Sequence, residues 1–298
     1  MIKINWVKET LNVDLPADVQ IECLGLADST LDNTLTFLDD QKFLDRVIRN
    51  KCISSVLTNE SIAHELANEL ISFHVIIVPD PRRSFYMLYN VLARENRILS
   101  KSLIHPSAII HPSANIAENN VVISEGVIIG PNSTILMDVV IGKNVEIGSN
   151  TTLGCEGAEV KSTNKGLLRV EHDGKLIVKD NVSIGSNCTI DKGFKNSDTV
   201  IGFGTVIANQ CMIAHSTKIG ANCLLIQCIV CGSVVVGDNV RINPGAVVSN
   251  QLNIGRNAKI GLGTVVIKNV KENANVSGFY AIDHNTHLYK YVKLFGKI

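Results

Sequence analysis

Between residues 104 and 266, an aliphatic residue returns every six positions with few breaks. A period of six fits neither the 3.6-residue period of an amphipathic helix nor the strict alternation of a hairpin meander. Repetition on this scale is typical of repeat architectures. The aliphatic positions are Ile123, Ile129, Ile135, Ile141, Ile147, Leu153, Val178, Ile184, Ile190, Ile201, Ile207, Ile213, Ile219, Val236, Ile242, Val248, Ile254, Ile260 and Val266.

The other positions of the six-residue unit are restricted too. Glycine often follows the aliphatic residue, as at Gly142 and Gly148, and asparagine often stands two positions further on, as at Asn144 and Asn150. Glycine fits where backbones crowd, and asparagine is the non-glycine residue that best tolerates left-handed φ. Each unit therefore predicts one short strand and one tight corner. Three units make one coil, so about twenty units predict a triangular parallel solenoid of roughly seven coils.

The first part of the chain alternates between strand-like and helical patterns, which predicts a small α/β domain. Asp80 and Pro81 fit the N-cap and the first turn of its last helix. The expected strands lie at 19–24, 34–37, 53–57 and 75–78, and the expected helices at 40–49, 61–71 and 81–94.

These patterns predict a mainly β protein in three parts. Residues 1–100 form the α/β domain, residues 101–275 form the parallel β-helix, and residues 276–298 form a short helical tail. The repeat breaks between Gly154 and Val178, which predicts an excursion loop at 155–177 with a turn near 172–175.

Composition narrows the function classes. The 28 basic residues balance 28 acidic ones, so no overall charge favours nucleic acid as a partner. No apolar run is long enough to span a membrane, and no signal peptide is evident, so we expect a cytoplasmic protein. The eight cysteines are expected to be reduced thiols. Cys228 and Cys231 form a lone CxxC without the second pair that a zinc site needs.

The six-residue units resemble the hexapeptide-repeat acyltransferases, and this resemblance implies a left-handed β-helix, whereas the general rule for parallel crossovers predicts the opposite hand. The segment from Asn209 to His215 is similar to one in the UDP-3-O-acylglucosamine N-acyltransferases of lipid A biosynthesis. The resemblance implies that His215 is the general base, a task that suits an imidazole because its ordinary pKa is about 6.5. His215 stands two positions after the inward Ile213, which places it outside the coil.

Further residues are implied by the same resemblance. Gly232 matches a glycine whose N–H faces the thioester oxygen, although the coil from Ile219 to Val236 is one residue short and leaves the alignment uncertain by one position. Gln251 stands at the place of a second active-site histidine and can donate a hydrogen bond without carrying a proton. The remaining implied substrate-contacting residues of the β-helix are Asn209, Gln210 and Asp191, the last with its role left open. His105 and His111, at corners normally held by glycine, are expected to be structural.

The segment from Phe37 to Phe43 resembles the uridine-binding segment of that family. Phe37 and Phe43 match two aromatics that hold the base, but Asp40 replaces an asparagine. A carboxylate only accepts hydrogen bonds, so guanine, and to a lesser degree thymine, stay open beside uracil. The other interpretation is that both phenylalanines are ordinary core. Glu159 and Val160 also replace aromatics at the start of the excursion.

We therefore expect an N-acyltransferase that uses a nucleotide-linked amino sugar and an acyl thioester. The alternatives within this class are the lipid A step with an acyl carrier protein donor and an O-antigen type of enzyme with acyl-CoA. The family also implies a homotrimer and neither a bound cofactor nor a metal. A sugar acetyltransferase with a dinucleotide-like motif is disfavoured because no GxGxxG follows the first strand. A zinc carbonic anhydrase is disfavoured because it needs three converging histidines, and His215 has no partner one coil away on the same face. A non-catalytic solenoid binder is disfavoured because it predicts a regular outward ladder of one residue type, and the outward positions here are mixed.

Overall fold

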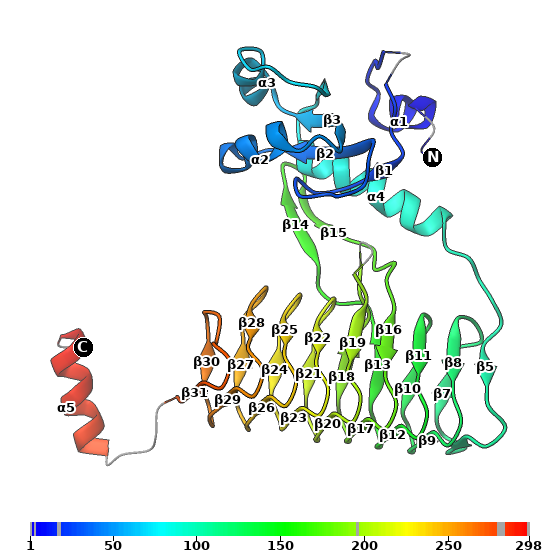
Figure 1. Cartoon of the computed structure of the whole chain (residues 1–298), viewed down its shortest axis with the longest axis vertical. Coiled ribbons are helices and arrows are strands. Elements are labelled where there is room, and N and C mark those ends of the chain that lie inside the picture. Colours follow the sequence, from blue (N-terminus) through cyan, green and yellow to red (C-terminus); the bar gives the residue numbers. More distant parts are fainter. Residues whose placement is uncertain (1, 3, 17–18, 195–196, 279–283, 297–298) are drawn as a thin grey trace. The chain divides into compact units, whose positions relative to one another are not determined.

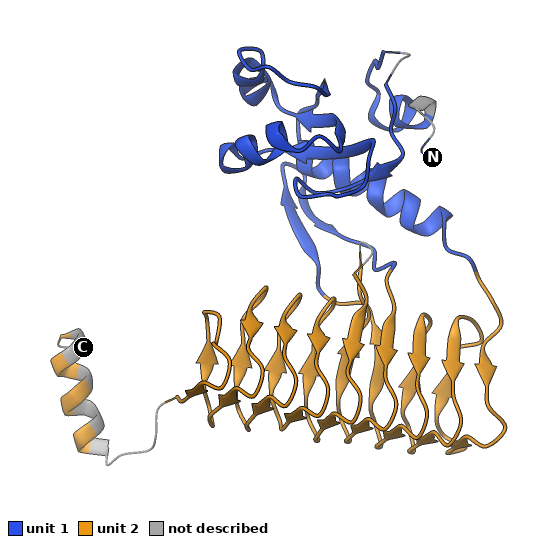
Figure 2. Ribbon diagram, viewed as in Figure 1, with its two compact units in different colours: residues 1–98, 158–173 blue, residues 99–157, 174–298 orange. Residues whose placement is uncertain are grey.

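The computed structural model describes residues 2, 4–16, 19–194, 197–278 and 284–296, and Figure 1 shows its helices and strands. The chain divides into two compact units (Figure 2). The first contains residues 1–98 together with residues 158–173. The second contains residues 99–157 and 174–298.

The first unit is built on a parallel four-stranded sheet in the order β1-β2-β3-β4. Helix α4 packs on β2 and β3, while Val47 of α2 and Ile62 of α3 join Val56 of β3 in an apolar cluster. The α/β character expected from the sequence is therefore confirmed. Its elements are α1 (Ile4–Leu11), β1 (Cys23–Leu24), β2 (Thr34–Leu38), η1 (Gln41–Phe43), α2 (Leu44–Arg49), β3 (Ile53–Thr58), α3 (Glu60–Leu66), β4 (His74–Ile77) and α4 (Pro81–Glu95).

Local sequence signals explain the helix beginnings. The Asp80 side chain accepts a hydrogen bond from the Arg83 N–H at 2.8 Å, and Pro81 occupies the first turn of α4, as expected. Asn59 caps α3 in the same way through the Ile62 N–H. The expected strand at 19–24 shortens to β1, although Val19 and Ile21 are buried. The alternation of apolar residues at 19–24 therefore reflects side-chain burial, and only its last two residues pair with a neighbouring strand.

The excursion from the repeat is a β-hairpin of the first unit. Strands β14 (Val160–Thr163) and β15 (Gly166–Arg169) pair antiparallel. The hairpin turn lies at Asn164 and Lys165, and within the predicted turn at 172–175 the chain bends at Gly174, where it returns to the second unit. His172 is fully buried, and Gly166 supplies the positive φ of +92° that the hairpin turn requires.

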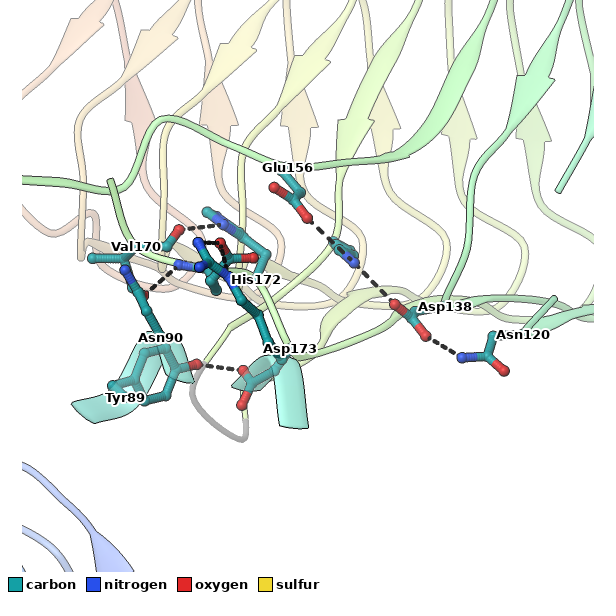
Figure 3. Close-up of polar contacts among 11 residues, drawn as sticks. Tyr89, Asn90, Asn120, Asp138, Glu156, Val170, His172 and Asp173 are labelled. Atoms are coloured by element: carbon teal, nitrogen blue, oxygen red, sulfur yellow. Dashed lines mark hydrogen bonds and ion pairs between the residues drawn. The ribbon is translucent and has the colours of Figure 1, made fainter. Parts of the chain in front are cut away.

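Side chains of α4 hold this hairpin. Asn90 donates to the Arg169 carbonyl at 2.8 Å and accepts from the Glu171 N–H at 2.9 Å (Figure 3). Tyr89 donates to the Asp173 carboxylate, and Asp80 accepts from the Asn164 N–H at 2.7 Å. The excursion is thus a structural part of the first unit, which the sequence pattern alone did not reveal.

The second unit is a parallel β-helix of three sheets, with eight, eight and nine strands (Figure 1). It has more coils than the roughly seven expected, because the strands extend from 103 to 276. The first sheet contains β7 (Asn115–Ile116), β10 (Thr134–Ile135), β13 (Thr152–Cys155), β18 (Thr189–Asp191), β21 (Met212–Ile213), β24 (Ile229–Val230), β27 (Val247–Val248) and β30 (Val265–Val266).

The second and third sheets complete the triangle. The second contains β5 (Leu103–Ile104), β8 (Val121–Ile123), β11 (Val139–Ile141), β16 (Leu176–Val178), β19 (Thr199–Ile201), β22 (Lys218–Ile219), β25 (Val235–Val236) and β28 (Asn253–Ile254). The third contains β6 (Ile109–Ile110), β9 (Ile128–Ile129), β12 (Glu146–Ile147), β17 (Ser183–Ile184), β20 (Val206–Ile207), β23 (Leu224–Leu225), β26 (Arg241–Ile242), β29 (Lys259–Ile260) and β31 (Asn275–Val276).

The six-residue unit works as the sequence indicates. The repeated aliphatic residues stack in register, as in the row Ile190, Ile213, Val230 and Val248, and form one continuous core. Most corners carry an asparagine or another polar residue with positive φ. The glycine after the strand is required by crowding: a Cβ atom at Gly202 would lie 2.4 Å from the Gly220 carbonyl carbon.

Two corners near the middle of the β-helix depart from this unit. The corner between β23 and β24 is short, and it accounts for the missing residue between Ile219 and Val236. The corner between β18 and β19 is enlarged and contains Phe194, which forms an isolated bridge with Ser197.

The first coil is stabilised at its corners by histidines. His105 Nδ1 accepts from the Ser107 N–H at 3.2 Å, and His111 Nδ1 accepts from the Ser113 N–H at the same distance. Each serine hydroxyl then accepts a hydrogen bond from a backbone N–H of the next coil. These side chains make the structural contacts expected of them. The last element is α5 (His284–Phe295), and none of the helices in the described part of the chain is long and apolar enough to cross a membrane.

Candidate active site at one corner of the beta-helix

Four consecutive coils place different side chains at the same corner, where the first sheet turns into the second. Because Ile190, Ile213, Val230 and Val248 pair in register, the residues two positions later also lie on adjacent coils. These residues are Lys192, His215, Gly232 and Asn250.

His215 and Gly232 are in direct contact at this corner. A Cβ atom at Gly232 would lie 2.5 Å from His215 Cε1 and 2.7 Å from Nε2, so only glycine leaves room for the imidazole. The Ser233 N–H donates to the His215 carbonyl at 2.9 Å and fixes the two coils. The shortened corner lies on another edge of the triangle. The register of Gly232 against His215 is therefore unambiguous, which the sequence had left open.

Phe194 contacts the other side of the imidazole. The ring centroids of Phe194 and His215 are 5.0 Å apart, and the rings meet edge to face at 75°. The Phe194 N–H also donates a hydrogen bond to the Ser216 hydroxyl at 3.4 Å. His215 is consequently half-buried and held between an aromatic ring and a glycine, rather than free on the outside of the coil.

The Gly232 N–H already has an acceptor within the chain. It donates to Asn250 Oδ1 at 3.1 Å, whereas the Gly232 carbonyl accepts from the Gln251 N–H at 3.0 Å. Gln251 has the positive φ of 59° typical of a corner residue, and Asn250 lies directly beside Gly232. The exposed Asn250 was not singled out from the sequence.

Lys192 forms a buried ion pair on the coil next to His215. Its side chain is 3% exposed, and Nζ lies 2.9 Å from Asp138 Oδ2 and 3.9 Å from Glu156 Oε1. Asn120 Nδ2 donates to the other Asp138 oxygen at 2.9 Å (Figure 3). The Lys192 N–H also donates to the Cys155 carbonyl at 2.9 Å. This network joins the coils at the point where the hairpin leaves the β-helix.

Asp191 precedes this lysine and is itself buried, with 4% of its surface exposed. Burial raises the pKa of the Asp191 carboxyl to about 6, because the charged form loses hydration. Its strand partner Cys155 also has a thiol pKa raised to about 11, mainly by burial. Protonated and ionised forms of Asp191 are therefore both accessible near neutral pH.

Two of the predicted substrate-contacting residues lie at a different corner. Asn209 and Gln210 connect β20 to β21, and both are exposed. Asn209 Oδ1 accepts from the Ser186 N–H at 2.8 Å, and Gln210 Oε1 accepts from Gln227 at 3.1 Å. The strand β21 separates them from His215, so the structure does not group them with the His215 corner.

The predicted base-binding residues belong to the first unit. The Phe37 ring packs against Phe85 at 5.0 Å and Tyr86 at 5.8 Å between ring centroids, and it is only partly exposed. Phe43 packs against the apolar cluster of the sheet and carries Lys42 over its ring at 4.9 Å. Both phenylalanines thus have packing partners in the first unit, while each stays half-buried.

Asp40 caps the short helix η1 between these phenylalanines. Its carboxylate accepts from the Lys42 N–H at 3.0 Å and pairs with Lys42 Nζ at 2.6 Å. These hydrogen bonds from Lys42 hold the pKa of Asp40 below its ordinary value. The group is therefore an ionised acceptor near neutral pH, and it cannot donate as the expected asparagine would.

Sequence reasoning missed Phe194, Asn250 and the Lys192 network. The eleven-residue step from Ile190 to Ile201, in place of six, was the available signal for the loop that carries Phe194. Asn250 follows from the register once the short corner is placed. Among the described residues, no three histidine, cysteine or acidic side chains gather closely enough to hold a metal ion.

Comparisons with known proteins agree with this architecture. Residues 120–155 match the family profile described as "Bacterial transferase hexapeptide (six repeats)". The UDP-3-O-acylglucosamine N-acyltransferase of Herminiimonas arsenicoxydans is 30% identical over 134 residues, which cover 45% of this chain and 38% of that protein. The enzyme of the same name from Bordetella pertussis is 32% identical over 108 residues, covering 36% and 30%. The chain thus matches well under half the length of these relatives.

Solved structures share the β-helix. A UDP-N-acetylglucosamine acyltransferase has a TM-score of 0.50 with 24% identity and covers 65% of this chain and 77% of its own. The corresponding Campylobacter jejuni protein has a TM-score of 0.50 with 20% identity, covering 65% and 85%. The resemblance seen in the sequence is confirmed for the repeat and for the fold. The chain is a left-handed parallel β-helix protein built on the bacterial transferase hexapeptide repeat.

Proposed function

We propose that this chain is an N-acyltransferase that moves an acyl group from a thioester to the amine of a nucleotide-linked amino sugar. The observation that carries the proposal is the His215 imidazole lying directly over Gly232 at one corner of the β-helix. The relatives named UDP-3-O-acylglucosamine N-acyltransferase support the same class of reaction.

The chemistry needs one base and one oxyanion donor. The amine attacks the thioester carbonyl carbon, a C–N bond forms and the C–S bond breaks. His215 takes the proton from the attacking amine and returns it to the departing thiolate, a role worth roughly 10²- to 10⁴-fold in rate. The Gly232 N–H stabilises the negative oxygen of the tetrahedral intermediate, which contributes a similar factor. Phe194 restricts the orientation of the imidazole ring through their edge-to-face contact.

The donor and the sugar define two forms of the proposal. One is the lipid A step, with an acyl carrier protein donor and a uridine nucleotide. The other is a surface-polysaccharide type of enzyme that uses acyl-CoA and a different nucleotide, which is consistent with Asp40 replacing the asparagine of the uridine-binding segment. The test is a transfer assay that pairs acyl-CoA or acyl carrier protein with UDP-, dTDP- or GDP-linked amino sugars. Mass spectrometry should detect an acylated sugar for at least one pair, and no product from any pair would reject the proposal.

Nucleotide recognition should depend on Asp40. Guanine presents N1–H and an exocyclic amine side by side, a pattern that suits a carboxylate, whereas an amide suits uracil. We expect Asp40→Asn to strengthen UDP binding and weaken GDP binding, each by about tenfold, equivalent to about 1.4 kcal/mol. Calorimetric titration with UDP, dTDP and GDP measures this exchange.

The control for that exchange is Asp14→Asn, since Asp14 is an exposed carboxylate of the same unit whose lysine pair is long at 3.5 Å. It should leave all three affinities unchanged. Phe37→Leu keeps the packing against Phe85 but removes the aromatic face, so it should weaken every nucleotide. Equal binding of the three nucleotides to all of these variants would show that the first unit does not recognise a base.

Assembly into a homotrimer is part of the proposal. Apolar side chains point outward from the β-helix, including Leu103, Ile109 and Val265, each about two-thirds exposed. Packing of sheet faces between three copies would cover them. We expect light scattering at micromolar concentration to give three times the mass of the 32.3 kDa chain. A stable monomer under those conditions would contradict this assembly.

A further inference from the structure

The Gly232 N–H donates to a side chain, unlike the N–H groups on either side of it, and side-chain acceptors of this kind also occur at other corners, as where Asp238 accepts from the Ala221 N–H. The Cys231 N–H donates to the Val248 carbonyl and the Ser233 N–H to the His215 carbonyl, so both bonds belong to the backbone ladder. The Gly232 N–H between them donates to a side-chain oxygen, Asn250 Oδ1. Backbone acceptors are fixed by the fold, whereas an exposed asparagine can rotate away without disturbing the coil.

The position of that oxygen has a chemical meaning. Asn250 Oδ1 is an amide carbonyl oxygen 3.1 Å from the Gly232 N–H, beside the imidazole of His215. A thioester carbonyl oxygen held by the same N–H would have to occupy the same place. The asparagine oxygen therefore stands in for the oxygen of an acyl donor.

We propose that Asn250 is a displaceable placeholder that fills the oxyanion position until the acyl donor enters. This inference rests on the proposed acyl transfer, and it adds a residue that controls access to it. Asn250 keeps the Gly232 N–H oriented and satisfied in the free protein. The donor must break this bond, so Asn250 lowers donor affinity and favours donors whose carbonyl oxygen replaces it.

Two substitutions at Asn250 should act in opposite directions. In Asn250→Ala the competing acceptor is gone, so donor KM should fall about threefold to tenfold with little change in kcat, given the net strength of one hydrogen bond. In Asn250→Asp a charged acceptor binds the same N–H more strongly, so donor KM should rise about tenfold or more. A passive corner residue would change thermal stability and leave KM unaltered.

The matched control is Asn269→Ala. Asn269 Oδ1 accepts from the Asn253 N–H at 2.9 Å, so it makes the same kind of side-chain bond one coil further along. Asn269 belongs to the coil after the four that place residues at the His215 corner. This variant should match Asn250→Ala in any loss of melting temperature but keep the donor KM of the wild type.

Direct binding separates this inference from the proposed function. A ketone analogue of the donor, with CH₂ in place of the thioester sulfur, keeps the carbonyl oxygen but cannot transfer its acyl group. A thioether analogue lacks that oxygen. Calorimetry with both analogues, carried on CoA or acyl carrier protein, should show tighter ketone binding in Asn250→Ala and unchanged thioether binding.

Each result of this titration is decisive. Ketone binding that Asn250→Ala leaves unchanged would overturn the placeholder while the proposed function stands. An equal gain for ketone and thioether would also overturn it, because the carbonyl oxygen would then play no part. If neither analogue binds the wild type, the thioester donor itself is wrong and the inference fails with it.

Discussion

His215→Ala should lower the acyl-transfer rate by about 10²- to 10⁴-fold while the protein stays folded. The imidazole is the only base that the structure brings against Gly232 within the described part of the corner, and alanine offers no proton acceptor. The ring contributes little to the core because Ile213 and Val230 fill the interior of these coils. The measurement is kcat with saturating donor and sugar, together with the melting temperature and nucleotide affinity.

His111→Ala is the matched control for this loss. His111 also stands at a corner of the β-helix, and its contact with the Ser113 N–H is structural. Its removal should lower the melting temperature slightly and leave kcat intact. Full turnover in His215→Ala would exclude His215 as the base. If instead that variant melts far below the wild type, the contact with Phe194 is a packing contact on which the coil depends.

The β-helix could be predicted from the sequence because the six-residue unit is local. Each aliphatic residue and each corner asparagine has the same surroundings as its counterpart in the next coil, so a pattern read along the chain becomes a row of contacts in space. The hairpin at 158–173 could not be assigned in this way. Its place depends on Asn90 and Tyr89, about 80 residues earlier in the chain.

The same distinction applies to the site. His215 and Gly232 were found from motifs, yet their contact became certain only when the strand register assigned the missing residue to the corner between β23 and β24. Asn250 and Lys192 meet their partners through side chains that reach across coils. Lys192 and Asp138 are separated by 54 residues, and no local pattern predicts that pairing. The base-binding expectation stays a proposal, because Phe37 and Phe43 both have packing partners in the first unit.

Lys192→Met should destabilise the β-helix by about 3–5 kcal/mol, which is the usual loss when one partner of a buried ion pair is removed. Methionine fills a similar volume, so the cost comes from charge and not from a cavity. The Asp138 carboxylate would keep its bond from Asn120 but lose the cation 2.9 Å away in a site that water hardly reaches. Urea denaturation followed by circular dichroism gives the free energy of unfolding directly.

Two further variants show whether charge burial is the cause. Lys143→Met removes an exposed lysine whose pair with Glu125 spans 3.3 Å, and such surface pairs are worth less than about 1 kcal/mol. Asp138→Asn in the Lys192→Met background should recover part of the stability, since asparagine tolerates the φ of 67° at that corner and can still accept from Asn120. A loss below about 1 kcal/mol in Lys192→Met, or no recovery in the double variant, would mean that the lysine is not a buried charge partner holding these coils together.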